Sequence, residues 1–555
     1  MKRLRILASL AVVSALLSAC AQIPHSSSVK AGPDMNGGLA ADFLYYSPSG
    51  PAQGATAAEV VNGFINAGTG PQNDYAVART FLSKSFSSTW NPSNQTLVQT
   101  GRPLLTQDAA HSLFKISANI VTSINSRGEL KQLKETKTLS FHLAKEAGEW
   151  RIDQAPDLTL LIKPVFDVIF QSYSIYFLDK PQQHLVPDVR WFPSRASTGT
   201  KMVAALLDGP TAWLAPAVSS AIPAGTKLNT SSVTIDGGLA TVDLTAKALK
   251  TNYSQKNLMR SQIYQTLIQL PTVINVRIEI DRSPQLIGTA DGEFVTQPSS
   301  SSFALINKNL YSFNNYKFSL IAGYHGYLTE SRATDFALNE SQTEFVVVGR
   351  DGLSVAFPHT RGAALKLLDV RPNLVTPIID SSQLVWSMQS DSGHGIRVFD
   401  NYKNVASFSP NWMHGLSNKH FAVSPDDARL LVSGYQNGKS LLYAVAIIRD
   451  AKGIPKLGIP KLITSRSSLA IDINWVSQSD IVISNYSSTG TQIPEQLTIG
   501  GESTAFPAFD ASVNLAASSN GSQVFLLTKG SELYQNRNLG WVLVRRNISA
   551  FHFAH

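Results

Sequence analysis

The spacing of hydrophobic residues changes along the chain, and the first stretch combines two periods. Residues 57–83 place apolar side chains such as Val60 at helical intervals, which predicts two short helices. From about Ile116 the apolar period becomes two and continues on both sides of a turn at 145–148, which predicts an antiparallel hairpin. We therefore expect an N-terminal α+β domain over residues 51–160.

The next stretch mixes helices and strands, and we expect a second domain over residues 166–290. A helix that begins near Thr198 meets the breaker Asp208-Gly209-Pro210, and a second helix further on ends at a proline. Strand patterns cover 228–244, as a hairpin, and 273–280. The order strand, helix, two strands, helix, strand predicts a compact α/β sandwich.

Beyond about residue 300 the helical spacing disappears and short apolar strand patterns repeat. They recur at intervals of roughly forty to fifty residues, each after a polar turn, which is typical of β-propeller blades. The repeats are 345–348, 384–386, 430–432, 481–483 and 524–527. Residues 300–555 are thus expected to form a propeller of five or six blades, with tandem β-sandwiches as the alternative. The whole chain is predicted to be multidomain, α+β first and all-β afterwards.

The first twenty residues have the pattern of a lipoprotein signal peptide. Three basic residues precede an apolar stretch, 6–17, that is too short for a helix across a roughly 30 Å hydrocarbon core. This stretch ends at Leu17-Ser18-Ala19-Cys20, which resembles a lipobox. We expect residues 1–19 to be removed, Cys20 to carry S-diacylglycerol and N-acyl groups, and residues 20–50 to act as a flexible membrane tether. The alternative is an ordinary signal peptide in which this cysteine occurs by chance.

The composition narrows the classes of function. The chain has 555 residues, of which 43% are hydrophobic and 15% charged, so it is globular rather than disordered. Its formal net charge is +8, three of these positive charges lie at Lys2, Arg3 and Arg5, and the remaining excess is too dilute to indicate a nucleic-acid partner. Cys20 is the only cysteine. With Cys20 lipidated, no disulfide, cysteine-ligated zinc or cysteine nucleophile is expected.

The sequence lacks the motifs of common exported hydrolases. It contains no G-x-S-x-G, H-E-x-x-H or P-loop pattern. Ser112 and Lys115 fit S-x-x-K, but the S-D-N and K-T-G triplets that would accompany a catalytic pair are missing. We therefore predict a non-enzymatic protein with no catalytic residue, no metal and no cofactor.

Histidines and tryptophans do not define a binding site in the sequence. His394, His414 and His420 lack metal-ligand spacing, and surface or blade-packing roles are predicted for them. Trp412 lies in a loop between strand patterns and is the best candidate for an exposed contact. The ligand-binding residues stay unassigned.

The rival class of protein is a propeller that binds or cleaves cell-wall glycan. Cleavage would require two carboxylates roughly 5–10 Å apart in the central funnel. Asp380, Asp426 and Asp480 fall in turns of the repeat, so we expect them at blade edges rather than in the funnel. A module that senses a cell-wall ligand and reports it to a partner is a third alternative.

Several short motifs resemble one family of exported proteins. They are 74–82, Trp150-Arg151-Ile152, Tyr176-Phe177, Leu185-Val186-Pro187-Asp188, Leu206-Leu207-Asp208-Gly209-Pro210, Trp213-Leu214 and Val242-Asp243-Leu244. Together with the lipobox and the propeller repeat, they resemble the actinobacterial LpqB lipoproteins over essentially the whole chain. The motifs in the second domain are similar to the GerMN module of sporulation and germination proteins.

This resemblance implies an accessory protein on the extracytoplasmic face of the cell membrane. The family is associated with the MtrA–MtrB two-component system, so the implied partner is the outer domain of the sensor kinase MtrB, with consequences for cell-envelope homeostasis and division. A lipid anchor would raise the effective concentration of a partner in the same membrane. We expect the GerMN-like module, 166–284, to carry the partner surface with help from the preceding domain, and a surface on the propeller is the alternative.

Overall fold

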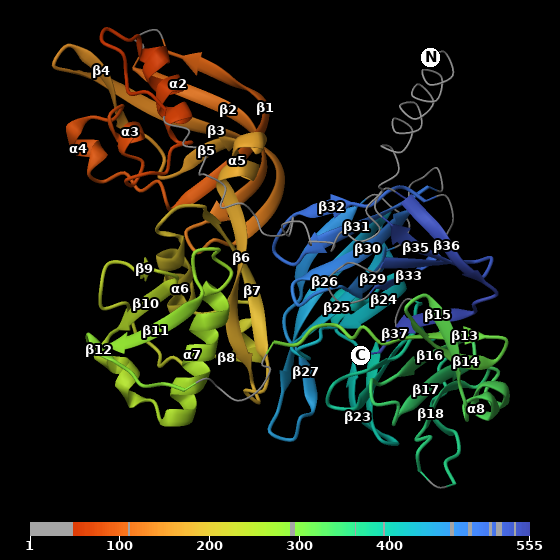
Figure 1. Cartoon of the computed structure of the whole chain (residues 1–555). Coiled ribbons are helices and arrows are strands. Elements are labelled where there is room, and N and C mark those ends of the chain that lie inside the picture. Colours follow the sequence, from red (N-terminus) through yellow and green to blue (C-terminus); the bar gives the residue numbers. More distant parts are fainter. Residues whose placement is uncertain are drawn as a thin grey trace, which may run out of the picture. The chain divides into compact units, whose positions relative to one another are not determined.

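The computed structural model describes residues 48–554 apart from nine short gaps (Figure 1). The gaps are 109–111, 289–294, 361, 392–394, 467–470, 487–490, 510–512, 518–523 and 538–539. The expected signal peptide, Cys20, nearly all of the expected tether and His394 therefore lie outside the described residues.

The N-terminal domain is a five-stranded sheet in the order β4-β3-β2-β1-β5, accompanied by short helices. Its elements are α2 (Ala57–Ala67), α3 (Ala76–Arg79), α4 (Lys84–Ser87), β1 (Gln95–Gln107), β2 (Leu113–Asn125), β3 (Leu130–Glu146), β4 (Glu149–Gln154) and β5 (Thr159–Ile162). Thr56 and Glu59 form a capping box that starts α2. The buried face of α2 packs Phe64 against Phe141 of β3. The predicted helices and the hairpin around 145–148 are confirmed.

The second domain has two sheets and two main helices. Its elements are α5 (Lys163–Ile169), β6 (Phe170–Asp179), β7 (Leu185–Pro193), α6 (Thr198–Asp208), η1 (Ala215–Ala217), β8 (Val218–Ser219), β9 (Thr234–Asp236), β10 (Leu239–Leu244), η2 (Ala246–Lys250), α7 (Tyr253–Leu267), β11 (Asn275–Ile280) and β12 (Ser283–Pro284). The sheets have the orders β7-β6-β8 and β12-β11-β10-β9, with β10 and β11 parallel. Met202 of α6 and Ile263 of α7 share one buried core with Val242 and Ile278 of the second sheet.

Two details of this domain differ from the sequence prediction. Two strands, β6 and β7, precede α6 where one was expected. The predicted strand from 228 is interrupted: Leu228 forms an isolated antiparallel bridge with Leu244, and the pairing with β10 resumes only in the three residues of β9. Between them the Thr230 hydroxyl donates to the Ser232 carbonyl at 3.1 Å. Such local bonds compete with a strand ladder.

The third domain contains six antiparallel sheets in its described residues, and each sheet is one propeller blade (Figure 1). Blade one contains β13 (Ser302–Ile306), β14 (Asn309–Asn314), β15 (Lys317–Ile321) and β37 (Ala550–Phe553). Blade two contains β16 (Asp335–Leu338), β17 (Phe345–Gly349), β18 (Gly352–Ala356) and β19 (Lys366–Asp369). Blade three contains β20 (Ile378–Ile379), β21 (Leu384–Met388), β22 (Ile396–Asp400) and β23 (Lys403–Phe408). Two short helices, α8 (His325–Glu330) and η3 (Asn411–Met413), accompany them.

Blades four to six follow the same plan. Blade four contains β24 (Ser417–Val423), β25 (Arg429–Gln436), β26 (Lys439–Arg449), β27 (Pro455–Leu457) and β28 (Lys461–Arg466). Blade five contains β29 (Ile471–Trp475), β30 (Asp480–Tyr486), β31 (Gln492–Thr498) and β32 (Ser503–Ala505). Blade six contains β33 (Val513–Ala517), β34 (Val524–Thr528), β35 (Glu532–Arg537) and β36 (Gly540–Arg546). The last strand, β37, pairs with β13, so the C-terminal strand completes the first blade and closes the ring. This closure leaves the propeller without a long exposed sheet edge between its first and last blades.

Candidate functional site

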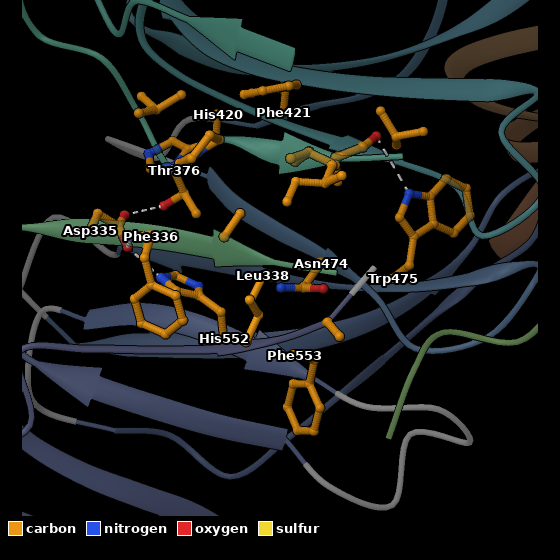
Figure 2. A pocket seen from close by; sticks show the side chains of 18 of the residues that line it. Asp335, Phe336, Leu338, Thr376, His420, Phe421, Asn474, Trp475, His552 and Phe553 are labelled. Atoms are coloured by element: carbon orange, nitrogen blue, oxygen red, sulfur yellow. Dashed lines mark hydrogen bonds and ion pairs between the residues drawn. The ribbon is translucent and has the colours of Figure 1, made fainter. Parts of the chain in front are cut away.

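A cavity of about 440 Å³ lies in the propeller, walled by the innermost strand of each blade (Figure 2). The walls come from β37, β16, β20, β24, β29 and β33, together with residues Gln297 and Ser299 just before the first blade. A volume within roughly 300–1,000 Å³ is typical of small-molecule sites. The funnel of this propeller therefore has the volume of a small-molecule site.

Six polar side chains, one from each blade, line one level of this cavity. They are His552, Asp335, Thr376, His420, Asp472 and Asn514, in blade order. Alternation along the strands explains the arrangement: Phe336 and Leu338 enter the blade core, so Asp335 and Ala337 face the other way. We call these six residues the polar ring.

The Asp335 carboxylate is fully engaged within the polar ring. Its Oδ1 lies 2.5 Å from Nε2 of His552, and its Oδ2 accepts from the Thr376 hydroxyl at 2.5 Å (Figure 2). The backbone N–H of Phe336 donates to it at 2.9 Å. Burial works against both charges, but the ion pair and these hydrogen bonds outweigh it, so the pKa of Asp335 is lowered and the pKa of His552 is raised.

Asp472 forms a second pair of the same kind on another blade. Its Oδ1 lies 3.2 Å from Nδ1 of His420, and its carboxylate accepts from the backbone N–H groups of Ile473 at 2.9 Å and Leu515 at 2.7 Å. Burial lowers the pKa of His420, but attraction to Asp472 and their hydrogen bond raise it above its usual value. The polar ring thus holds two carboxylate–histidine pairs.

Mostly small side chains line the next level of the cavity, two residues further along five of the six inner strands. Ala337, Ile378, Ala422, Asn474 and Ala554 occupy this level. Three of these five are alanines, so the strands leave open space where larger side chains would fill the funnel. The Asn474 amide, labelled in Figure 2, has no hydrogen-bond partner among the described residues.

This chemistry suits binding better than acid–base catalysis. A glycosidase general acid needs a carboxyl group whose pKa is raised, whereas that of Asp335 is lowered. Asp335 and Asp472 each pair with an imidazole and accept from backbone N–H groups, so neither is free to act as a nucleophile. The residues that the structure describes contain no group of three or more His, Cys, Asp or Glu able to hold a metal ion.

The turn aspartates lie outside the cavity, where the sequence analysis expected them. Asp380 accepts from Nε1 of Trp386 at 2.8 Å and from Arg449 at 2.7 Å, and Asp426 pairs with Arg429. Asp480 accepts from the hydroxyls of its neighbours Ser477 and Thr498. These carboxylates hold turns and adjacent blades together.

Other residues singled out in the sequence lie in different settings. The expectation that His420 is a surface or blade-packing residue is wrong, because it belongs to the polar ring. His414 is exposed and lies outside the cavity, and Trp412 is half-buried with its ring 5.1 Å from that of Tyr443. Ser112 donates to Asp108 at 3.1 Å.

The sequence analysis missed most of the polar ring, although a signal was present. Five of its members precede the central apolar run of their blade by roughly eight to ten residues. Aligning the repeats on those runs would have placed Asp335, Thr376, His420, Asp472 and Asn514 in one column. His552 could not be found this way, because its blade is completed by the far end of the chain.

Comparison with known proteins covers the three domains in turn. A family model for the N-terminal domain of lipoprotein LpqB matches residues 50–167, one described as sporulation and spore germination matches 174–285, and one for the LpqB β-propeller domain matches 309–550. Relatives called lipoprotein LpqB include those of Cutibacterium acnes, 29% identical over 55% of this chain and 50% of the relative, and Thermobifida fusca, 28% identical over 54% and 50%. The match thus spans about half the length of these relatives.

One solved structure resembles part of the second domain. It is the first GerMN domain of the sporulation protein GerM from Bacillus subtilis, with 21% identity, a TM-score of 0.19, and coverage of 22% of this chain and 94% of that one. The chain is a multidomain protein with a GerMN-like domain and a β-propeller. It belongs to the LpqB lipoprotein family. No helix among the residues described here is long and apolar enough to cross a membrane.

Proposed function

We propose that the protein is a lipid-anchored, extracytoplasmic accessory protein that binds the outer domain of the sensor kinase MtrB and influences cell-envelope homeostasis and division. Membership of the LpqB family and the lipobox-like Leu17-Ser18-Ala19-Cys20 support this proposal. Lipidation of Cys20 would hold the protein on the membrane that carries the kinase. The protein acts by binding rather than by catalysis.

The observation that carries the proposal is a set of three exposed apolar side chains on the GerMN-like domain. Leu249, Tyr253 and Leu286 are 53%, 64% and 98% exposed. Two contacts bring the start of α7 to the segment after β12: Lys256 donates to Gln285 at 3.0 Å, and a Cβ on Gly288 would lie 3.0 Å from the Tyr253 hydroxyl. We call Leu249, Tyr253 and Leu286 the apolar patch.

The surroundings of the apolar patch resemble those of a protein interface. Lys247 and Lys250 lie on η2 beside Leu249, and Lys256 is on the first turns of α7. An apolar centre with a charged rim is common in protein–protein interfaces, and tyrosine is enriched among the residues that dominate their binding energy. We therefore assign the contact with the kinase to this face of the GerMN-like domain.

The test measures binding of the full-length protein in detergent to the purified outer domain of MtrB. Replacing Leu249 and Tyr253 together by serine should weaken binding about thirtyfold, the loss typical of a hot spot worth about 2 kcal/mol. The matched control replaces Ile459 and Leu462, 79% and 50% exposed on the propeller, by serine and should bind like the parent. Loss of binding in the control but not in the patch variant would place the partner on the propeller instead.

A further inference from the structure

The cavity in the propeller funnel has the size and wall of a built site, and the accessory role proposed above does not use it. Its walls combine the polar ring with a level of small side chains, and its volume is about 440 Å³. The residues that line it come from all six blades, so they are assembled only when the ring of blades closes. The chemistry of this wall limits what can occupy it.

Charged ligands are disfavoured by the way the charges of the wall are paired. A cation would need an open carboxylate oxygen, but those of Asp335 and Asp472 already accept from imidazoles, a hydroxyl and backbone N–H groups. Glu340, the third carboxylate of the lining, accepts from the Ser299 hydroxyl at 3.2 Å. An anion would meet these two carboxylates as well as the two imidazoles, and no lysine or arginine is among the described lining residues. Glu340, also in the lining, adds further negative charge.

A hydrocarbon ligand is disfavoured for a different reason. It would cover the polar ring and the Asn474 amide without offering them hydrogen bonds, and covering unpaired polar groups costs about 1–3 kcal/mol each in proteins. The occupant must therefore be uncharged and able to form several hydrogen bonds.

The groups that remain open are suited to hydroxyl and carbonyl oxygens. Nδ1 of His552 and Nε2 of His420 have no partner among the described residues, while the other nitrogen of each ring is held by its aspartate. The open nitrogen of each ring can donate an N–H to a ligand oxygen when the ring is protonated and accept from a ligand hydroxyl when it is neutral. The Asn474 amide can both donate and accept, and Ala337 offers a small apolar surface for C–H groups.

We propose that this funnel binds a neutral sugar of one or two rings, with its hydroxyl or carbonyl oxygens on His420, His552 and Asn474. Sugar rings combine many hydroxyls with apolar C–H faces, which matches a polar level next to a level that contains three alanines. The backbone and carboxylate contacts of Asp335 and Asp472 orient the two histidines.

The test is calorimetric titration of the full-length protein in detergent with sugars that differ in charge. The neutral probes are N-acetylglucosamine, its β-1,4-linked dimer, glucose and maltose; glucosamine supplies a cation and glucuronic acid an anion. At least one neutral probe should bind saturably and about tenfold or more tighter than either charged probe. Failure of all four neutral probes to bind, or tighter binding of a charged probe, would overturn the proposal.

Variants locate the binding in the funnel. Ala337→Leu fills the cavity and should weaken binding at least about tenfold, whereas Ala505→Leu, on an exposed outer strand, should not change it. Asn474→Ala removes hydrogen bonds to the ligand and should weaken binding by about two- to tenfold. Thermal unfolding of each variant is measured in parallel. A correctly folded Ala337→Leu protein with the affinity of the parent would show that the sugar binds elsewhere and would refute the assignment.

Discussion

One buried ion pair in the second domain links two of the motifs that resemble the LpqB lipoproteins. Asp188 ends the motif Leu185-Val186-Pro187-Asp188, and Arg190 follows two residues later; their side chains are only 4% and 1% exposed and lie 2.8 Å apart. Asp188 also accepts from the backbone N–H of Thr211, just after the Asp208-Gly209-Pro210 breaker, at 2.6 Å. Arg190 donates to the Arg127 carbonyl at 3.0 Å. The pair therefore fixes the end of α6 against β7.

Replacing Arg190 by leucine should destabilise this domain strongly. The substitution leaves the Asp188 carboxylate buried without its cation, and breaking a buried pair in this way costs about 3–5 kcal/mol. For a domain of roughly 110 residues, each kcal/mol corresponds to about 4 °C in Tm. We expect the unfolding transition of the GerMN-like domain to fall by roughly 10–20 °C.

Differential scanning calorimetry of the full chain measures this effect. Arg277→Leu, which removes an exposed arginine from β11 of the same domain, is the matched control and should move the transition little. The double variant Asp188→Asn with Arg190→Leu should recover part of the loss, because it removes the uncompensated charge while Asn can still accept from Thr211. A single Arg190→Leu variant as stable as Arg277→Leu would refute the reasoning.

Three further predictions concern the anchor and the propeller. Cys20→Ala should move the protein from the membrane fraction to the soluble fraction on cell fractionation, and retention as firm as that of the parent would contradict lipidation. Burial, with repulsion from Asp380 and Asp400, raises the pKa of Glu344 to about 7, so between about pH 4.5 and 7 the folded state keeps a proton that the unfolded state has lost. The free energy of unfolding should therefore fall as pH rises through this range. In thermal melts Glu344→Gln should be more stable than the parent at pH 8 but not at pH 4. Burial lowers the pKa of His552, but attraction to Asp335, with a smaller effect of Asp472, raises it above its usual value. The contribution of protonated His552 to stability is therefore complete below about pH 6.5 and disappears as pH rises through its folded-state pKa. His552→Gln should lower Tm more at pH 5.5 than at pH 9, and an equal loss at both would contradict the pair.

Local patterns were sufficient to predict most of the fold. The helical spacing around Val60 gave α2, and the central strand of five blades, such as β17 and β25, appeared as an apolar run because it is covered on both faces. The closure of the first blade was not predictable in this way. β37 and β13 are about 250 residues apart in the chain, and no local pattern encodes their pairing.

The polar ring was harder to predict than the blades for a physical reason. An inner strand is short, and its side chains alternate between the funnel and the blade core. A single polar residue in or just before such a strand, for example Thr376 before β20, therefore resembles an ordinary turn residue. The role of Thr376 in the funnel depends on the five other residues of the polar ring, which the closed ring of blades brings to the same level. The hydrophobic pattern predicts the blades one at a time, whereas a funnel site exists only in their assembly.

The partners of the aspartates show why one residue type has two roles in this propeller. In the turns, Asp426 pairs with Arg429 and Asp380 with Arg449, and these long guanidinium side chains are buried and fill the space around them. In the funnel the partners of the aspartates are histidines instead. An arginine at position 420 or 552 would balance the same charge, but its longer side chain and five N–H donors would extend into the cavity and occupy the hydrogen-bonding positions that a ligand needs. Histidine neutralises the carboxylate with one nitrogen and leaves the other for the cavity, so the choice of cation is itself an argument that the funnel is a binding site and not a packed core.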